Sequence, residues 1–226
     1  MLRSSAARFG SVRVRTPAVA PGQRIGIMGG TFNPPHDGHV LISETALKRL
    51  RLDQLWWLVT PGNPLKANGG LPSLESRMAA CRAMITDPRI KVTGFERELG
   101  TPYTAATLGF LTKRFPDIRF VWVMGADNLA GFHRWQQWQH IMRLMPVAIV
   151  DRPGWRHRAL AAKAAQTYRG AFVSESRAAA LPFLKPPAWT MLTGPLSELS
   201  STALRAAGRN VNASPMPQQH GGGSTL

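Results

Sequence analysis

The chain has 226 residues, 44% of them hydrophobic, and carries 28 Lys and Arg against 12 Asp and Glu. This composition is sufficient for a folded core and excludes a wholly disordered chain. The formal net charge of +16 suggests an anionic partner: a nucleic acid, a membrane surface or phosphorylated small molecules. No apolar run approaches the roughly 20 residues needed to cross a bilayer. The single cysteine, Cys81, excludes an internal disulfide and a cysteine-based metal site.

The two ends of the chain differ in composition from its middle. Residues 1–23 are basic, contain no acid and are rich in Ser, Ala and Val, which predicts a disordered leader or an organellar transit peptide. Residues 210–226 have no Lys, Arg, Asp or Glu and several Pro, Gln and Gly, which predicts a flexible tail. The expected folded domain is therefore 24–209. The first 24 residues hold five arginines, and the rest of the chain keeps a net charge of +11.

Short apolar runs alternate with helical spacings along this domain. We expect strands at 24–28, 54–60, 90–93, 119–124, 146–150 and 189–192. We expect helices at 38–50, 73–86, 103–115, 134–144 and 200–207. This alternation predicts an α/β fold, a Rossmann-like doubly wound parallel sheet in a single domain with a small C-terminal helical element. Ligands of such sheets bind beyond the carboxyl ends of the strands, so the loops that follow strands are expected to carry the chemistry.

The loop after the first expected strand reads GGTFNPPHDGH, residues 29–39. Its first two glycines let the backbone approach a ligand closely. His36 and His39 are three residues apart at the loop-to-helix junction, so both imidazoles lie on one side of the first turn. The N–H groups at the start of the helix add positive potential beside them. The pattern predicts a polyphosphate site; alternatives are a zinc-binding pair, for which no further His or Cys cluster supplies ligands, or two surface histidines.

A second candidate anion site lies near the other end of the chain. Ser200, Ser201 and Thr202 can cap the start of the last expected helix, where hydroxyl and free N–H groups can hold phosphate. Arg205 lies one turn further on and can reach the same anion. The alternative is an ordinary helix cap beside a surface arginine.

These segments resemble a known superfamily. GGTFNPPHDGHV resembles the His-x-Gly-His loop of the nucleotidyltransferases, and LSSTALR, at 199–205, resembles their Ile-Ser-Ser-Thr-x-Ile-Arg motif. PGNPLK at 61–66, PYTAATL at 102–108, and GADNL at 125–129 with Trp135 downstream resemble motifs of the bacterial nicotinate-nucleotide adenylyltransferases. The matches run in family order from about residue 24 to residue 205. Asn33, Pro35, Leu65 and Ala106 depart from the common pattern, which has Asp, Ile or Val, His and Asp there.

The resemblance implies an enzyme that transfers AMP from ATP to nicotinate mononucleotide, giving deamido-NAD and pyrophosphate in NAD biosynthesis. It implies His36 and His39 as the catalytic residues, which stabilise charge on the α-phosphate and on the leaving pyrophosphate, and Mg²⁺ that arrives with ATP without a protein metal site. The residues expected to bind ATP and its phosphates are Gly29, Gly30, Thr31, Phe32, Gly38, Lys66, Ser200, Ser201, Thr202 and Arg205. Those expected to bind nicotinate mononucleotide are Asn33, Tyr103, Thr104, Asp127 and Trp135.

Other interpretations stay open at this stage. The nearest alternative is another transferase of the superfamily, such as phosphopantetheine adenylyltransferase, but His36, the chain length and Trp135 count against it. A preference for nicotinamide mononucleotide stays open, because a single carboxylate distinguishes the two substrates. Trp135 could be a core residue, and Arg152 could be structural or could line the nucleotide pocket. A basic nucleic-acid-binding protein fits the charge but shows no binding motif. We expect a cytoplasmic enzyme without nucleic-acid or membrane partners, and leave a homo-oligomer open.

Overall fold

The computed structural model describes residues 6–9, 12–62, 71–101 and 103–194, with side chains from residue 14 onward. The expected helix at 200–207 and the expected tail at 210–226 lie outside these residues. So do five of the expected phosphate-binding residues: Lys66, Ser200, Ser201, Thr202 and Arg205.

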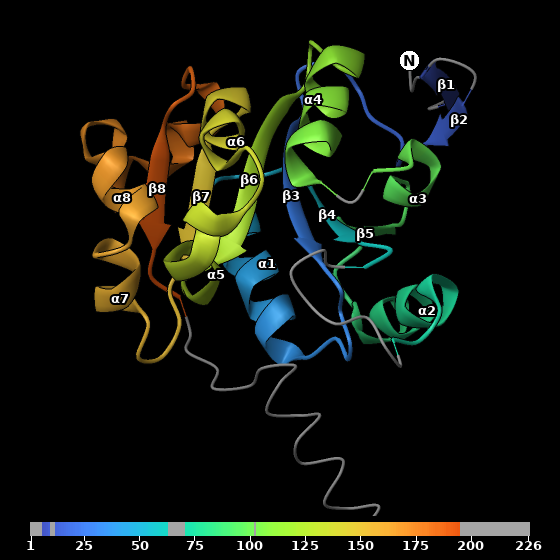
Figure 1. Ribbon diagram of the computed structural model, residues 1–226, viewed down its shortest axis with the longest axis horizontal. Coiled ribbons are helices and arrows are strands. Elements are labelled where there is room, and N and C mark those ends of the chain that lie inside the picture. Colours follow the sequence, from blue (N-terminus) through green and yellow to red (C-terminus); the bar gives the residue numbers. More distant parts are fainter. Residues whose placement is uncertain (1–5, 10–11, 63–70, 102, 195–226) are drawn as a thin grey trace, which may run out of the picture.

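Six parallel strands form the central sheet (Figure 1), in the order β5-β4-β3-β6-β7-β8. They are β3 (Arg24–Gly30), β4 (Gln54–Val59), β5 (Ile90–Thr93), β6 (Arg119–Gly125), β7 (Val147–Val150) and β8 (Trp189–Leu192). Each lies within two residues of its expected position, because a strand buried on both faces appears in the sequence as a near-continuous apolar run. The predicted parallel α/β fold is confirmed.

Helices cover both faces of the sheet (Figure 1). They are α1 (Asp37–Arg49), α2 (Leu74–Met84), α3 (Glu96–Leu99), α4 (Thr104–Arg114), α5 (Ala126–Gly131), α6 (Trp138–Leu144), α7 (Arg156–Leu160) and α8 (Lys163–Thr167), with 3₁₀ turns η1 (Phe132–Arg134), η2 (Arg169–Ala171) and η3 (Glu175–Phe183). One core cluster packs α4, α5 and α6 on the sheet, and the other packs α1, α2 and η3 on the opposite face. No helix among the described residues is both long and apolar enough to cross a bilayer.

The N-terminal segment differs from the expected disordered leader. Strands β1 (Ala6–Phe9) and β2 (Val12–Arg15) pair as an antiparallel hairpin. Val14 is fully buried and Val19 is 3% exposed, and both belong to the same core cluster as α4. The backbone N–H of Arg15 also donates to Glu98 on α3, at 2.7 Å. The packed unit therefore begins before Arg24, because these two valines bury their side chains with the domain.

The expected helix at 134–144 is interrupted. Residues 132–134 form η1, Gln137 has a left-handed φ of 54°, and α6 begins only at Trp138. Helical spacing of the two tryptophans at 135 and 138 suggested one continuous helix, but both rings pack on Phe132, at 5.3 and 6.2 Å between centroids. Tertiary packing of aromatic rings overrides the local helical pattern here.

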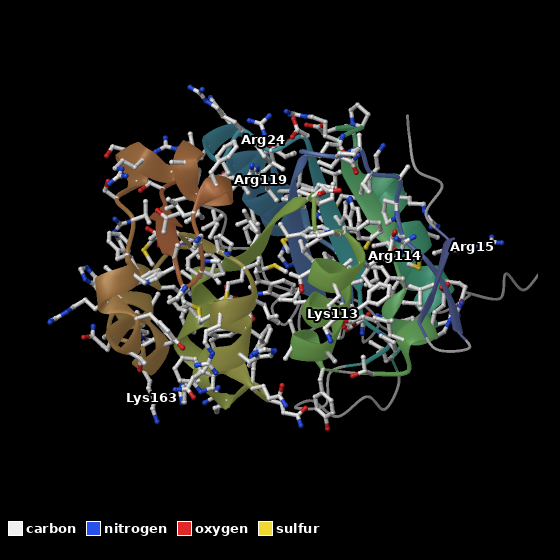
Figure 2. The ribbon with its side chains drawn as sticks, turned by 90° about the horizontal axis from the view of Figure 1, so that it is seen from above. Arg15, Arg24, Lys113, Arg114, Arg119 and Lys163 are labelled. Atoms are coloured by element: carbon white, nitrogen blue, oxygen red, sulfur yellow. The ribbon has the colours of Figure 1, made fainter. Side chains whose placement is uncertain are left out.

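Several basic residues lie at the amino ends of the strands, opposite the end where ligands are expected. Arg24 and Arg119 are neighbours in the register of β3 and β6, and Lys113 and Arg114 close α4 (Figure 2). Arg24 is bound by Asp53, and the guanidinium of Arg119 lies 4.7 Å from the ring centroid of Phe183. This part of the positive charge therefore does not face the carboxyl ends of the strands.

A buried carboxyl in α3 should make stability depend on pH. Glu96 is 2% exposed and accepts a 2.8 Å hydrogen bond from Thr107 Oγ1, and burial raises its pKa from 4.5 to about 7. Between those values the folded state holds more protons than the unfolded state, so the contribution of Glu96 to stability falls as pH rises. Glu96→Gln, which does not titrate, should gain ~3 kcal/mol relative to wild type between pH 4.5 and 7. Urea unfolding across that range, with the exposed Glu44→Gln as control, measures it; parallel curves for Glu96→Gln and wild type would contradict it.

Candidate active site

The loops that follow the strands meet at one edge of the sheet. β3 ends at Gly30, and the backbone N–H of Thr60, just after β4, donates to the Gly30 carbonyl at 2.9 Å. β6 ends at Gly125, and Asp127 follows it. β7 ends at Val150, and Arg152 follows it. Residues from loops that are distant in the sequence therefore meet at the carboxyl ends of the strands, where the site was predicted.

The two histidines of the first loop stand in direct contact at the start of α1. Their ring centroids are 3.9 Å apart, and the backbone N–H of His36 donates to Nδ1 of His39 at 3.2 Å. A nitrogen that accepts a hydrogen bond carries no proton, so the proton of neutral His39 resides on Nε2. Nε2 is thus a donor fixed beside the N-terminus of a 13-residue helix. This is the geometry that an anion-binding site requires.

Burial keeps both imidazoles neutral. Burial, with a smaller contribution from the positive charge of Arg152, lowers the pKa of His36 to about 4. Burial, with smaller contributions from His36 and Arg152, lowers the pKa of His39 to about 3. At neutral pH the pair therefore offers N–H donors without carrying charge. Because both pKa values lie well below 6, the protonation state of the pair does not change across the physiological pH range.

Aromatic rings and a serine hold His39 in place. The Phe32 ring lies 4.7 Å from the His39 ring and stacks on Trp57 at 4.9 Å. Ser43 Oγ donates to the His39 carbonyl at 2.8 Å and accepts from Trp57 Nε1 at 2.7 Å. Phe32 is 1% exposed, so its ring lies inside the fold, where it supports His39, and its contact with ATP stays a prediction. Trp57 and Ser43 were not predicted, because each looks like an ordinary core residue in the sequence.

An ion pair lies beside the histidines. Arg152 Nη1 is 3.2 Å from Asp127 Oδ2, and the charges of both residues act on His36. Gly125 adjoins the pair: an added Cβ would lie 2.5 Å from Asp127 Oδ1 and 3.2 Å from Arg152 Cδ. The structure therefore places Asp127 and Arg152 together beside the histidine pair, and the role of Asp127 in binding the mononucleotide stays a prediction.

Glycines keep the first loop close to the sheet. A Cβ on Gly29 would lie 2.7 Å from the Trp122 ring, and one on Gly30 would lie 3.2 Å from the Phe32 ring. Gly38 is buried in the first turn of α1. Thr31 and Asn33 are partly buried in the same loop. The structure therefore brings the predicted residues of this loop together.

Among the described residues, three that are expected to bind the mononucleotide have no direct contact with the histidine pair: Trp135, Tyr103 and Thr104. Trp135 is partly buried and packs edge-on against Trp122, at 6.2 Å between centroids, and Trp122 is the ring that lies beneath Gly29. Tyr103 is 41% exposed and lies just before α4, and Thr104 is the first residue of that helix. In the described part of the chain, no hydrogen bond or ring contact joins Tyr103 or Thr104 to the histidines.

A buried arginine of α2 is the main site residue that sequence reasoning missed. Arg77 is 3% exposed and binds backbone carbonyls of the loops after β3 and β4. The one indication in the sequence is that Arg77 lies on the same face of α2 as the buried Leu74 and Cys81, where a charged side chain is unusual. Carbonyl partners have no sequence signature, so its role was not predictable.

The described residues offer no built metal site. No group of three or more His, Cys, Asp or Glu side chains among them could hold a metal ion. The zinc alternative for the histidine pair gains no support from these residues.

The comparisons with known proteins agree with this geometry. The sequence profile of the cytidylyltransferase-like family matches residues 27–207, most of the chain, so the chain belongs to that family of nucleotidyltransferases. Two relatives are described as probable nicotinate-nucleotide adenylyltransferases. The Methylorubrum extorquens (strain PA1) protein is 57% identical over 182 residues, covering 80% of this chain and 98% of its own. The Agrobacterium fabrum protein is 54% identical over 181 residues, covering 80% and 97%. Within the family, the chain therefore belongs to the nicotinate-nucleotide adenylyltransferases, as the sequence predicted.

Solved structures support the fold. Plasmodium falciparum nicotinic acid mononucleotide adenylyltransferase complexed with APC superposes with a TM-score of 0.60 at 15% identity, covering 81% of this chain and 83% of that chain. The same enzyme complexed with NaAD gives 0.58 at 17% identity, with the same coverage. At these identities the likeness concerns the fold alone.

Proposed function

We propose that the chain transfers the adenylyl group of ATP to nicotinate mononucleotide, at the carboxyl ends of β3, β6 and β7. A phosphate oxygen of the mononucleotide attacks the α-phosphorus of ATP and forms the new P–O bond. The bond from the α-phosphorus to the bridging oxygen breaks, and pyrophosphate leaves with its electron pair. The nucleophile is already an ionised phosphate, so the reaction needs no general base and no covalent intermediate.

The paired neutral histidines are the observation that carries this proposal. Adenylyl transfer moves negative charge onto the α-phosphate oxygens and the leaving pyrophosphate, and donors already in position stabilise that charge. His39 supplies an N–H at Nε2, because its Nδ1 accepts from the backbone of His36. His36, in ring contact with it, is the second donor. We assign Gly30 and Thr31 to backbone contacts with the phosphates, and Lys66, Ser201, Thr202 and Arg205 to the triphosphate.

The metal belongs to the substrate in this proposal. The described residues lack a cluster of three metal-binding side chains, whereas triphosphate oxygens and water satisfy Mg²⁺ without a protein cage. ATP is therefore taken as its magnesium complex. We also propose that the enzyme works in the cytoplasm without nucleic-acid or membrane partners.

Trp135 should affect the pyridine nucleotide more than ATP. Trp135 follows η1, is partly buried and packs edge-on against the rings of Trp122 and Phe132. Trp122 in turn lies beneath Gly29 of the first loop. A flat indole face can stack on the nicotinate ring, a contact that ATP does not share. Trp135→Ala should raise KM for nicotinate mononucleotide about tenfold and KM for ATP by less than about threefold. Steady-state kinetics with each substrate varied measure this; equal changes would make Trp135 a core residue only.

Pyrophosphate release tests the proposed function. The full chain is incubated with ATP, Mg²⁺ and either nicotinate or nicotinamide mononucleotide, and pyrophosphate is measured. The proposal expects release with the nicotinate form, at a higher kcat/KM than with the amide. Release with the amide alone would reassign the substrate, and no release with either would overturn the proposal. The His39→Ala variant is the negative control.

A further inference from the structure

Arg77 joins three backbone segments around the candidate site. Its Nη1 donates to the carbonyls of Thr31 and Thr60, each at 2.8 Å. Its Nη2 donates to Pro61 at 3.3 Å and its Nε to Pro72 at 3.0 Å. The loop after β3, the loop after β4 and the turn before α2 thus meet at one planar guanidinium. A rigid fork of donors fixes several acceptors at once with little loss of entropy.

The bond to Thr31 controls the backbone next to the histidines. The peptide between Thr31 and Phe32 is trans, so its C=O and the Phe32 N–H point to opposite sides. Holding the carbonyl toward Arg77 therefore fixes the direction of the Phe32 N–H. Phe32 also has φ of 46°, a conformation unfavourable for a residue with a β-carbon, so contacts on both sides must hold it.

Phe32 carries this constraint to the catalytic pair. Its ring contacts the His39 ring at 4.7 Å and stacks on Trp57 at 4.9 Å. A rotation of the Thr31–Phe32 peptide would move this ring and remove one support of His39. A small displacement of a hydrogen-bond donor removes much of the stabilisation that it gives to a transition state, because the donor must already point at the developing charge.

We propose that Arg77 is a positioning residue, which sets the first loop against the second and, through Phe32, holds His39 in its working orientation. It is not a catalytic residue, since its donors are taken by backbone carbonyls. The inference rests on the proposed function, because His39 is the group that it positions.

A second arginine provides a matched control. Arg24, the first residue of β3, donates to Asp53, just before β4, from Nε at 3.0 Å and from Nη2 at 2.7 Å. It thus joins the same two strands as Arg77, but at their amino ends, on the face seen in Figure 2. Loss of either arginine removes a link between β3 and β4, but only Arg77 contacts the loop that carries the histidines.

The experiment compares Arg77→Met, Arg77→Lys and Arg24→Met in the full chain. Thermal midpoints are measured first, and kcat and both KM values are then measured well below the lowest midpoint. We expect kcat to fall about 10- to 100-fold in Arg77→Met and less than about threefold in Arg24→Met, with Arg77→Lys in between. Equal losses in the two Met variants, or less than about threefold in Arg77→Met, would overturn the proposal.

Hydrogen exchange provides a readout that does not depend on activity. Amides of residues 31–39 should exchange at least about tenfold faster in Arg77→Lys than in wild type. In Arg24→Met their exchange rates should equal those of wild type. Unchanged exchange in Arg77→Lys would refute positioning even if Arg77→Met does not fold. A wild-type chain that releases no pyrophosphate would refute the proposed function instead. The exchange result would still test whether Arg77 holds residues 31–39 in place.

Discussion

His39→Ala should lower kcat by about 100-fold or more while leaving the thermal midpoint within a few degrees of wild type. The variant removes the Nε2–H donor, which is fixed because Nδ1 accepts from the His36 backbone. Loss of one such donor costs about 3 kcal/mol of transition-state stabilisation, and each 1.36 kcal/mol is a factor of ten in rate. KM values should change less than kcat, because the donor binds charge that develops only in the transition state.

His39→Gln distinguishes the lost donor from a lost ring. Its amide nitrogen can donate from near the position of Nε2, so it should retain more activity than His39→Ala. Pre-steady-state measurement of the chemical step is needed, since product release can limit kcat. A His39→Ala enzyme that turns over within about threefold of wild type would remove His39 from the mechanism.

The pH dependence of the wild type follows from the same geometry. With the pKa of His36 at about 4 and that of His39 at about 3, neither imidazole changes charge between pH 6 and 8. Ordinary histidines titrate near 6.5, so an exposed pair would give a step in kcat/KM there. The folded values lie below the unfolded ones. The stability that the pair contributes is therefore complete above about pH 6.5 and is lost as pH falls toward 4 and 3.

The sheet and the anion site in the first loop were predicted for different reasons; the sheet is confirmed, and the anion site stays a prediction. Segments such as QLWWLV at β4 and RFVWVM in β6 are apolar on both sides, which leaves a buried parallel strand as their natural structure. The histidine spacing and the glycines of 29–39 predicted an anion site from local geometry alone. The hairpin near the N-terminus was missed although VRVR alternates with the period of a strand, because the arginine count dominated the interpretation of that segment.

The supports of the site could not be predicted. Arg77 binds carbonyls, Ser43 binds a carbonyl and an indole, and Phe32 depends on a positive φ. None of these partners has a signature in the residue types of a single sequence. Arg152 is an intermediate case. Its position after β7 placed it at the correct edge of the sheet, but only the structure shows that it pairs with Asp127 and that its charge acts on His36.

Arg152→Met should lower kcat/KM about 30- to 100-fold. The variant removes the cation that lies 3.2 Å from Asp127, whose side chain is 29% exposed. The remaining carboxylate would stand uncompensated where two phosphorylated substrates must bind, and like charges in a partly buried site repel strongly. The loss should appear mainly in KM, because repulsion acts on the bound substrates as well as on the transition state.

The double variant Arg152→Met with Asp127→Asn isolates the cause. If repulsion by Asp127 dominates, removing its charge should restore about tenfold of the activity lost in Arg152→Met, and the cycle should be strongly non-additive. If Arg152 itself binds phosphate, Asp127→Asn should restore no activity to Arg152→Met, and the effects of the two single changes should add in the double variant. Raising the salt concentration gives an independent test, since screening weakens repulsion by a partly exposed carboxylate and should partly rescue Arg152→Met but not the double variant. Kinetics within about threefold of wild type for Arg152→Met would leave the ion pair a purely structural one, and the histidines would then rely on α1 and the first loop alone for their positive surroundings.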